Sequence, residues 1–142
     1  AAHLKLFDER LTACTCPALL TAHPVAGPAD LHGMVLLQLA TRSDAWAAWF
    51  RGQGAAPPAR IDGMVMDQFS MMVQAAISGL GVALLPDYLA RPEIAEGRLV
   101  PILRPGVAGP GAYWLAWPED RAEGKPLQAF RGWLGRSIAA AP

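Results

Sequence analysis

Cysteine is scarce in this 142-residue chain, and neither sign of charge is in excess. The two cysteines, Cys14 and Cys16, are too few for a disulfide framework and too close together for a relaxed mutual bridge, so a reducing compartment is expected. Basic and acidic residues number 12 each and give a formal net charge of zero. Because a domain that binds nucleic acid carries an excess of positive charge on its surface, we expect this chain itself not to bind DNA.

Long apolar runs are also missing. No run reaches the roughly 18 to 20 residues that a membrane-spanning helix needs, and the first residues lack the charged and apolar regions of a secretory signal. No membrane partner is therefore expected. Hydrophobic residues nevertheless make up 53% of the chain, which is enough for one folding unit with a buried core.

Recognisable catalytic and metal-binding patterns are absent as well. His3, His23 and His32 have no HxxxH or CxxC spacing to a second ligand, which argues against zinc. Cys14 and Cys16 lie two apart on a predicted strand, and a buried pair is favoured over a redox or metal pair. There is no GxSxG nucleophile elbow and no P-loop, so we expect no enzyme activity, no metal and no cofactor.

One glycine motif, Gly79-Leu80-Gly81, resembles the start of a dinucleotide-binding loop. Such a loop must follow a strand and open a helix, so that the helix N-terminus faces the phosphates. Here the glycines close a predicted helix and open a predicted strand. We therefore interpret them as the C-terminal cap of that helix.

What is present is an alternation of strands and helices. The clearest helix is capped by Asp67 and ends at Gly79, and its apolar face consists of Phe69, Met72, Val73, Ala76 and Ile77. We expect strands over residues 11–16, 34–39, 61–66, 82–85, 99–103 and 112–117. We expect further helices that begin at Pro17, near Ser43 or Asp44, near Asp87 with a break at Pro92, and at Pro126. This order predicts a layered α/β domain.

Two features of this pattern could hold a ligand. At residues 67–70 the chain leaves a strand and starts a helix, so free backbone N–H groups and the positive end of the helix dipole could receive a carboxylate. Ordinary capping by Asp67 is the alternative. Trp46, Trp49 and Phe50 share one face of a helix, where we favour core anchors over an aromatic ligand cage.

Residues 71–86 (MMVQAAISGLGVALLP) closely resemble the helix-glycine-strand signature of LysR-type transcriptional regulators. Further motifs follow in family order, namely LFDERL at residues 6–11, the Cys16-Pro17 step, EGRLV at residues 96–100 and FRGWL at residues 130–134. Residues 41–50 and 113–119 are most similar to the branch that contains glycine-cleavage activators and β-lactamase regulators. The resemblance covers nearly the whole chain.

The resemblance implies an α/β fold like that of type 2 periplasmic binding proteins, with a mixed sheet and flanking helices in two subdomains around a cleft. It also implies a C-terminal fragment, because the family's winged helix-turn-helix, linker helix and first elements of subdomain one have no counterpart here. Residues 1–15 would be the crossover strand region, and residues 16–100 subdomain two. Residues 101–142 would be the return strands and C-terminal helix of subdomain one.

By the same resemblance, the chain would sense a small-molecule effector, an organic anion for example, within a cytoplasmic homo-oligomer that contacts DNA only through the N-terminal domain. Residues that match the family's pocket wall are Thr41 and Arg42 after a strand, Gln68 and Phe69 at a helix start, and Tyr113 on the return strand. Arg42 could pair with a carboxylate bidentately, with a solvated surface arginine as the alternative, and Phe69 also fits a core face. A fragment of an extracytoplasmic solute-binding protein of the same fold is the second hypothesis.

The zero net charge leads to a first prediction. The 142-residue chain, titrated against labelled promoter duplex at low salt, should show no saturable binding, because it lacks the cationic surface that displaces counterions from DNA. Submicromolar, sequence-dependent binding would contradict this expectation.

Overall fold

The computed structural model describes residues 2–61, 63–103, 107–117 and 124–139. Its elements are β1 (Ala2–Thr15), α1 (Pro17–Ala22), the 3-10 helix η1 (Pro28–Leu31), β2 (Gln38–Leu39), α2 (Ala45–Gly52), β3 (Val65–Met66), α3 (Phe69–Ile77), β4 (Ala83–Pro86), α4 (Asp87–Ala95), β5 (Val100–Pro101), β6 (Val107–Trp117) and α5 (Lys125–Ala139). The chain forms two compact units, whereas the sequence predicts one folding unit. The larger unit comprises residues 10–110, and the smaller unit comprises residues 1–9 and 111–142.

The sheet of the larger unit is mixed. β1 lies between β4 and β5 and is antiparallel to both, with Cys14 opposite Ala83 on β4 and Pro101 on β5. β2 and β3 pair in parallel. The prediction of a mixed α/β sheet is confirmed.

The residues just before β2 connect the parallel pair to β4. The backbone N–H of Leu37 donates to the carbonyl of Val82 at 2.8 Å, and the N–H of Val82 donates to the carbonyl of Val35 at 2.9 Å. Leu36 and Val82 form a parallel bridge between these hydrogen bonds. β3, β2 and β4 therefore run side by side in one direction.

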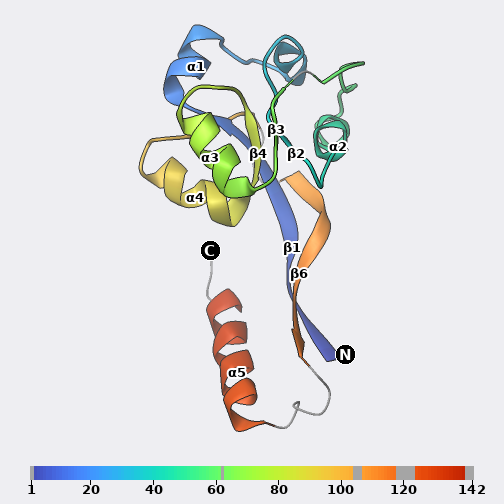
Figure 1. Cartoon of the computed structure of the whole chain (residues 1–142), viewed down its shortest axis with the longest axis vertical. Helices are drawn as coiled ribbons and strands as arrows, with labels where there is room; N and C mark the ends of the chain where they lie inside the picture. Colours follow the sequence, from blue (N-terminus) through green and yellow to red (C-terminus); the bar gives the residue numbers. More distant parts are fainter. Residues whose placement is uncertain (1, 62, 104–106, 118–123, 140–142) are drawn as a thin grey trace. The chain divides into compact units, whose positions relative to one another are not determined.

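Both faces of this sheet are covered by helices. Alternate strand residues enter different cores: Leu37 and Leu85 belong to the core beneath α3 and α4, whereas Leu36 and Leu84 belong to the core that contains the aromatic side chains of α2. Helices α3 and α4 both contact β4 (Figure 1). This alternation explains why Leu36, Leu37 and Leu39 are all apolar, because a segment covered on both faces has few positions left for polar side chains.

The aromatic residues of α2 are core anchors, as the sequence favoured. Trp46, Trp49 and Phe50 are each at most 2% exposed. Their rings meet edge to face, with centroids 5.4 Å apart for Trp46 and Trp49 and 5.1 Å apart for Trp49 and Phe50. Edge-to-face contact brings the positive edge of one ring to the negative face of the next, which adds to the gain from burial.

Helix α3 confirms the predicted apolar face and corrects the predicted cap. Met72, Val73 and Ala76 are buried, and Gly79 has a φ of +81°, a left-handed conformation suited to the residue that follows a helix. The N-cap, however, is Gln68, with an extended backbone at φ −138° and ψ 147°. Asp67 therefore lies one position too early to cap the helix, because a capping side chain must reach the second or third amide of the first turn.

Helix α4 does not break at Pro92, contrary to the sequence prediction. Pro92 lies inside the helix, and its carbonyl accepts the N–H of Glu96 at 3.1 Å. Proline has no N–H to donate to the carbonyl four residues earlier, but its own carbonyl still accepts, so the turn that follows Pro92 is hydrogen-bonded. Gly97, with a φ of +77°, then ends the helix as predicted.

Three predicted strands are shorter than expected. Only Val65 and Met66 of residues 61–66 are in a strand, only Val100 and Pro101 of residues 99–103, and only Gln38 and Leu39 of residues 34–39. Gly63 explains the first case, because a Cβ placed there would lie 1.7 Å from the carbonyl oxygen of Leu36. The chain passes too close to its neighbour at this point for regular pairing of side-chain-bearing residues.

The smaller unit contains the aromatic strand and the last helix. The predicted strand at residues 112–117 lies within β6, which pairs with β1, and α5 begins one residue before the predicted Pro126. On α5 the rings of Phe130 and Trp133 lie 6.0 Å apart and are 46% and 56% exposed. A pair of large aromatic side chains is thus accessible on this helix.

The contact between Gly81 and Val35 generates a second prediction. A Cβ at Gly81 would lie 2.6 Å from the carbonyl oxygen of Val35, so Gly81→Ala should force the two chains apart and lower the free energy of unfolding by about 1 to 3 kcal/mol. Gly33→Ala is the matched control, because nothing lies within 4 Å of its Cβ position. Urea denaturation measures both variants, and equal midpoints would contradict the prediction.

Candidate functional site

The carboxyl ends of the three parallel strands meet at one edge of the sheet. β2 leads into Thr41 and Arg42, β3 leads into Gln68 and Phe69, and β4 leads directly into Asp87. In open α/β sheets the loops beyond the carboxyl ends of parallel strands form the ligand-binding edge. Four of the five residues that the sequence singled out therefore come from adjacent strand ends.

Arg42 and Phe69 are in contact at this edge. The guanidinium carbon of Arg42 lies 5.6 Å from the centre of the Phe69 ring, within the range of a cation–π interaction. Both side chains are half-buried. Arg42 is therefore not the fully solvated surface arginine that the sequence left open as an alternative.

Beside this pair lies a small pocket with a cavity volume of about 10 Å³, the space of roughly one water molecule. Its lining residues all come from the larger unit and are Leu11, Leu37, Gln38, Leu39, Arg42, Ala45, Trp46, Phe69, Met72 and Leu84. Most of these side chains are apolar, and the polar ones are Gln38 and Arg42. A mostly apolar hollow with a few polar groups is the usual composition of a small-molecule site.

Two hydrogen bonds hold the lining in place. The indole N–H of Trp46 donates to the carbonyl of Leu37 at 2.8 Å, which joins α2 to the strand beside it. The amide Nε2 of Gln38 donates to the carbonyl of Ile61 at 3.3 Å. Both bonds connect a pocket side chain to backbone, so the walls are shaped by the fold itself.

Sequence reasoning missed Gln38 and treated Trp46 as core alone. A signal for Gln38 was available, because it is the one amide side chain within the apolar run of residues 34–39. A polar residue in a strand covered on both faces must find a partner or face an opening. Trp46 belongs to the core and also lines the pocket, and the spacing of apolar residues along a helix does not predict the second role.

Thr41 and Gln68 lie at the same sheet edge but do not line the pocket. Both are exposed, and the Oε1 atom of Gln68 accepts a hydrogen bond from the Ser70 hydroxyl at 3.3 Å. Tyr113 lies in β6 and belongs to the smaller unit, and its side chain is outside the part of the chain that the structure describes. The role of these three residues in binding stays a prediction.

Asp87, the third strand-end group, has a structural partner. Its Oδ1 atom accepts a hydrogen bond from the hydroxyl of Thr12, a buried residue of β1. The carboxylate also lies in the first turn of α4, where the helix dipole favours negative charge. Asp87 therefore joins α4 to β1.

The cysteines are a buried pair, as predicted. Both thiols are free and buried, and burial raises the pKa of Cys14 to about 12. A thiol with such a pKa stays protonated near neutrality and is a poor nucleophile. Within the described ranges, no group of three or more histidine, cysteine or acidic residues could hold a metal ion.

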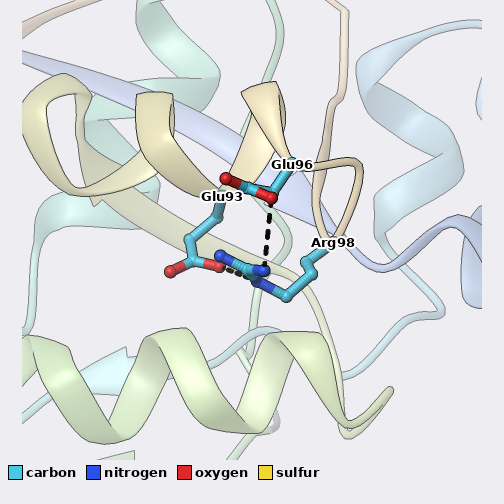
Figure 2. A network of polar contacts seen from close by, with 3 residues as sticks. All are labelled: Glu93, Glu96 and Arg98. Atoms are coloured by element: carbon cyan, nitrogen blue, oxygen red, sulfur yellow. Dashed lines mark hydrogen bonds and ion pairs between the residues drawn. The ribbon is translucent and has the colours of Figure 1, made fainter.

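A second group of charged side chains lies at the end of α4 (Figure 2). Arg98 forms ion pairs with Glu93 and, at 3.9 Å, with Glu96. Arg98 and Glu96 are exposed, so water screens these charges and the pairs contribute little to stability. The group connects the helix end to the following turn.

No helix among the residues described is both long and apolar enough to span a membrane.

Comparison with known proteins identifies relatives along almost the whole chain. The family model described as LysR substrate binding domain matches residues 2–139. The transcriptional activator AmpR of Pseudomonas aeruginosa is 36% identical over 134 residues, which cover 92% of this chain and 43% of that protein. The glycine cleavage system transcriptional activator of Escherichia coli is 35% identical over 137 residues, covering 96% of this chain and 45% of that protein.

Solved structures agree with the sequence relatives. The effector domain of Pseudomonas aeruginosa AmpR matches with a TM-score of 0.83 and 34% identity, over 96% of this chain and 64% of that domain. The regulator CrgA of Neisseria meningitidis, at 22% identity and a TM-score of 0.78, shares the fold. The chain thus spans less than half the length of the curated relatives described above and about two thirds of the effector domain.

The position of Phe69 leads to a third prediction. Its ring packs partly against the core beneath α3, so Phe69→Ala should lower the free energy of unfolding by about 1 to 3 kcal/mol, less than the roughly 3 to 5 kcal/mol typical of a fully buried phenylalanine. Met71→Ala is the control on the same helix, because Met71 is 54% exposed and its loss should change stability by less than about 0.5 kcal/mol. Denaturant titration of both variants makes the comparison. If the Phe69→Ala variant is as stable as the Met71→Ala control, the packing of Phe69 against the core does not contribute to stability.

Proposed function

Because the chain belongs to the LysR substrate-binding domain family, we propose that it is the effector-sensing part of a bacterial transcription regulator. The observation that carries this proposal is the pocket at the carboxyl ends of β2 and β3, with Arg42 and Phe69 in contact at its edge. The relatives at 35% and 36% identity are activators of transcription, which supports a regulatory role without catalysis. They give no support to the alternative of a solute-binding protein.

The proposed effector is a small organic anion. Arg42 supplies a cation at the pocket, and the first backbone N–H groups of α3 lie near Gln68 and Phe69 at the same sheet edge. Thr41 and Tyr113 complete the proposed ligand contacts, Thr41 as the residue before Arg42 and Tyr113 from β6. No cofactor or metal enters this proposal.

Regulation would follow from a shift between two arrangements of the protein. A ligand can shift such an equilibrium only if it binds one arrangement more tightly than the other. We propose that the complete regulator is a cytoplasmic homo-oligomer that contacts DNA through a domain outside residues 1–142. The exposed rings of Phe130 and Trp133 on α5 supply apolar surface of the kind that interfaces bury. In the proposed domain arrangement, residues 1–15 cross between subdomains, residues 16–100 form one, and residues 101–142 return to the other.

A thermal-shift screen of small organic acids tests the proposed function. A ligand at about one hundred times its dissociation constant should stabilise the chain by about 2.7 kcal/mol and raise its melting temperature. Arg42→Ala and Gln68→Ala should each weaken binding, by about 1.5 to 3 and about 1 to 2 kcal/mol respectively, because each removes hydrogen-bonding capacity near the anion. Gln74→Ala, an exposed position further along α3, should leave the affinity unchanged.

Gln68→Ala should leave the melting temperature of the free protein unchanged, because its side chain is exposed. Unaltered ligand affinity in this variant would remove the α3 turn from the binding site. A screen in which no organic acid raises the melting temperature would contradict the proposed function itself.

A further inference from the structure

Leu103 has a backbone conformation that leucine rarely adopts. Its φ is +59°, and it is the one non-glycine residue with a positive φ in the part of the chain that the structure describes. The other residues with positive φ are Gly54, Gly79 and Gly97, which carry no Cβ and adopt such angles freely. In leucine the Cβ comes close to the following carbonyl oxygen, so the left-handed conformation of Leu103 is strained. Strain of this kind persists only where the surrounding contacts hold it.

Contacts at Leu103 and at the residue before it hold this conformation. The N–H of Ile102 donates to the carbonyl of Ala13 on β1 at 2.7 Å. Ile102 is buried in the core that contains the aromatic side chains of α2, and Leu103 packs against the same core. Successive residues of a regular strand point to opposite faces of the sheet, so two neighbours enter one core only if the backbone turns between them. The positive φ of Leu103 supplies this turn, and the strain opposes the gain from burying its side chain.

Leu103 lies on one of the two connections between the compact units. The chain passes from the smaller to the larger unit between residues 9 and 10, within β1, and returns between residues 110 and 111, within β6. β5 and β6 both pair with β1, and Leu103 lies between them along the chain. Residues that absorb a large change of φ at such a connection are the usual sites of conformational change. A change of φ at Leu103 would alter the direction in which the chain continues from β5 to β6.

We propose that Leu103 is a conformational switch with two backbone states. In the first state, which the structure shows, φ is positive and the leucine side chain packs against the core. In the second state φ is negative, the strain is relieved and the side chain has left the core. This inference rests on the proposed function, because a shift between two arrangements of a regulator needs an element with two accessible conformations. It goes beyond that function in naming the element.

Methyl relaxation-dispersion NMR of the 142-residue chain, labelled with 13C in its leucine methyl groups, tests for the second state. The Leu103 methyl groups should show exchange on the microsecond-to-millisecond timescale, because the side chain moves away from the aromatic rings when φ changes. Leu36 is the matched control, since it is buried in the same core and its φ is not positive. Its methyl groups should show no such exchange.

Two substitutions test whether φ controls the switch. Valine is branched at Cβ and disfavours a positive φ more strongly than leucine, so Leu103→Val should raise the ratio of the second state to the first by about tenfold or more. Leu103→Met is the control, because methionine is also unbranched at Cβ and fills a similar volume. The intraresidue contact between the amide proton and the Hα proton, which is short when φ is positive, gives the readout. Its nuclear Overhauser effect should weaken in Leu103→Val and stay strong in Leu103→Met.

The outcomes distinguish a switch from a purely structural kink. An absence of exchange at Leu103 in the unaltered chain overturns the proposal, and so does equal exchange at Leu36, which would indicate motion of the whole core. A strong amide-to-Hα effect in a folded Leu103→Val variant also overturns it. If that variant does not fold, the measurement on the unaltered chain decides.

These measurements use no ligand and are therefore independent of the thermal-shift screen. If the screen finds a stabilising acid but Leu103 shows no exchange, the proposed function stands and the switch is wrong. If Leu103 exchanges alone but no acid binds, the two backbone states are real and the proposed function fails.

Discussion

The sheet of the larger unit must keep water from both of its faces, and most other features of that unit follow from this requirement. Because neighbouring strand residues point to opposite faces, Leu36 and Leu37 enter different cores, and so do Leu84 and Leu85. Each face then needs its own helices, with α3 and α4 on one side and α2 on the other. With both faces occupied, the strand ends are the part of the sheet that remains open to a ligand.

Much of this architecture is visible in the sequence because it depends on local patterns. The apolar face of α3, the left-handed glycines at Gly79 and Gly97, and the start of α1 at Pro17 follow from rules that involve only a few neighbouring residues. The errors arise where tertiary contact decides. Pro92 stays helical because the turn after it forms its own hydrogen bond, and pairing is lost near Gly63 because another strand comes close.

The residues of the candidate site also fall into those that the sequence predicts and those that only tertiary contact brings together. Arg42 and Phe69 could be chosen from the sequence because each follows a strand and the resemblance places both on a pocket wall, but their mutual contact joins residues 27 positions apart. Gln38 and Trp46 enter the site only through packing of α2 and β2 against each other. Spacing along the chain does not predict which side chains of two packed elements share one opening.

The hydrogen bond from the Trp46 indole to the Leu37 carbonyl has a consequence for how such a protein can change over generations. Leu37, Trp46 and Met72 line the pocket and also belong to the hydrophobic cores. A substitution at any of them removes packing from the folded state, and it is selected against even when the new pocket shape suits a new molecule. The lining residues Arg42 and Ala45 are different, because they are only half-buried and contribute less to the packing of the folded state. Descendants of this protein should therefore come to bind new small molecules through substitutions of half-buried lining residues, while the buried lining residues stay the same.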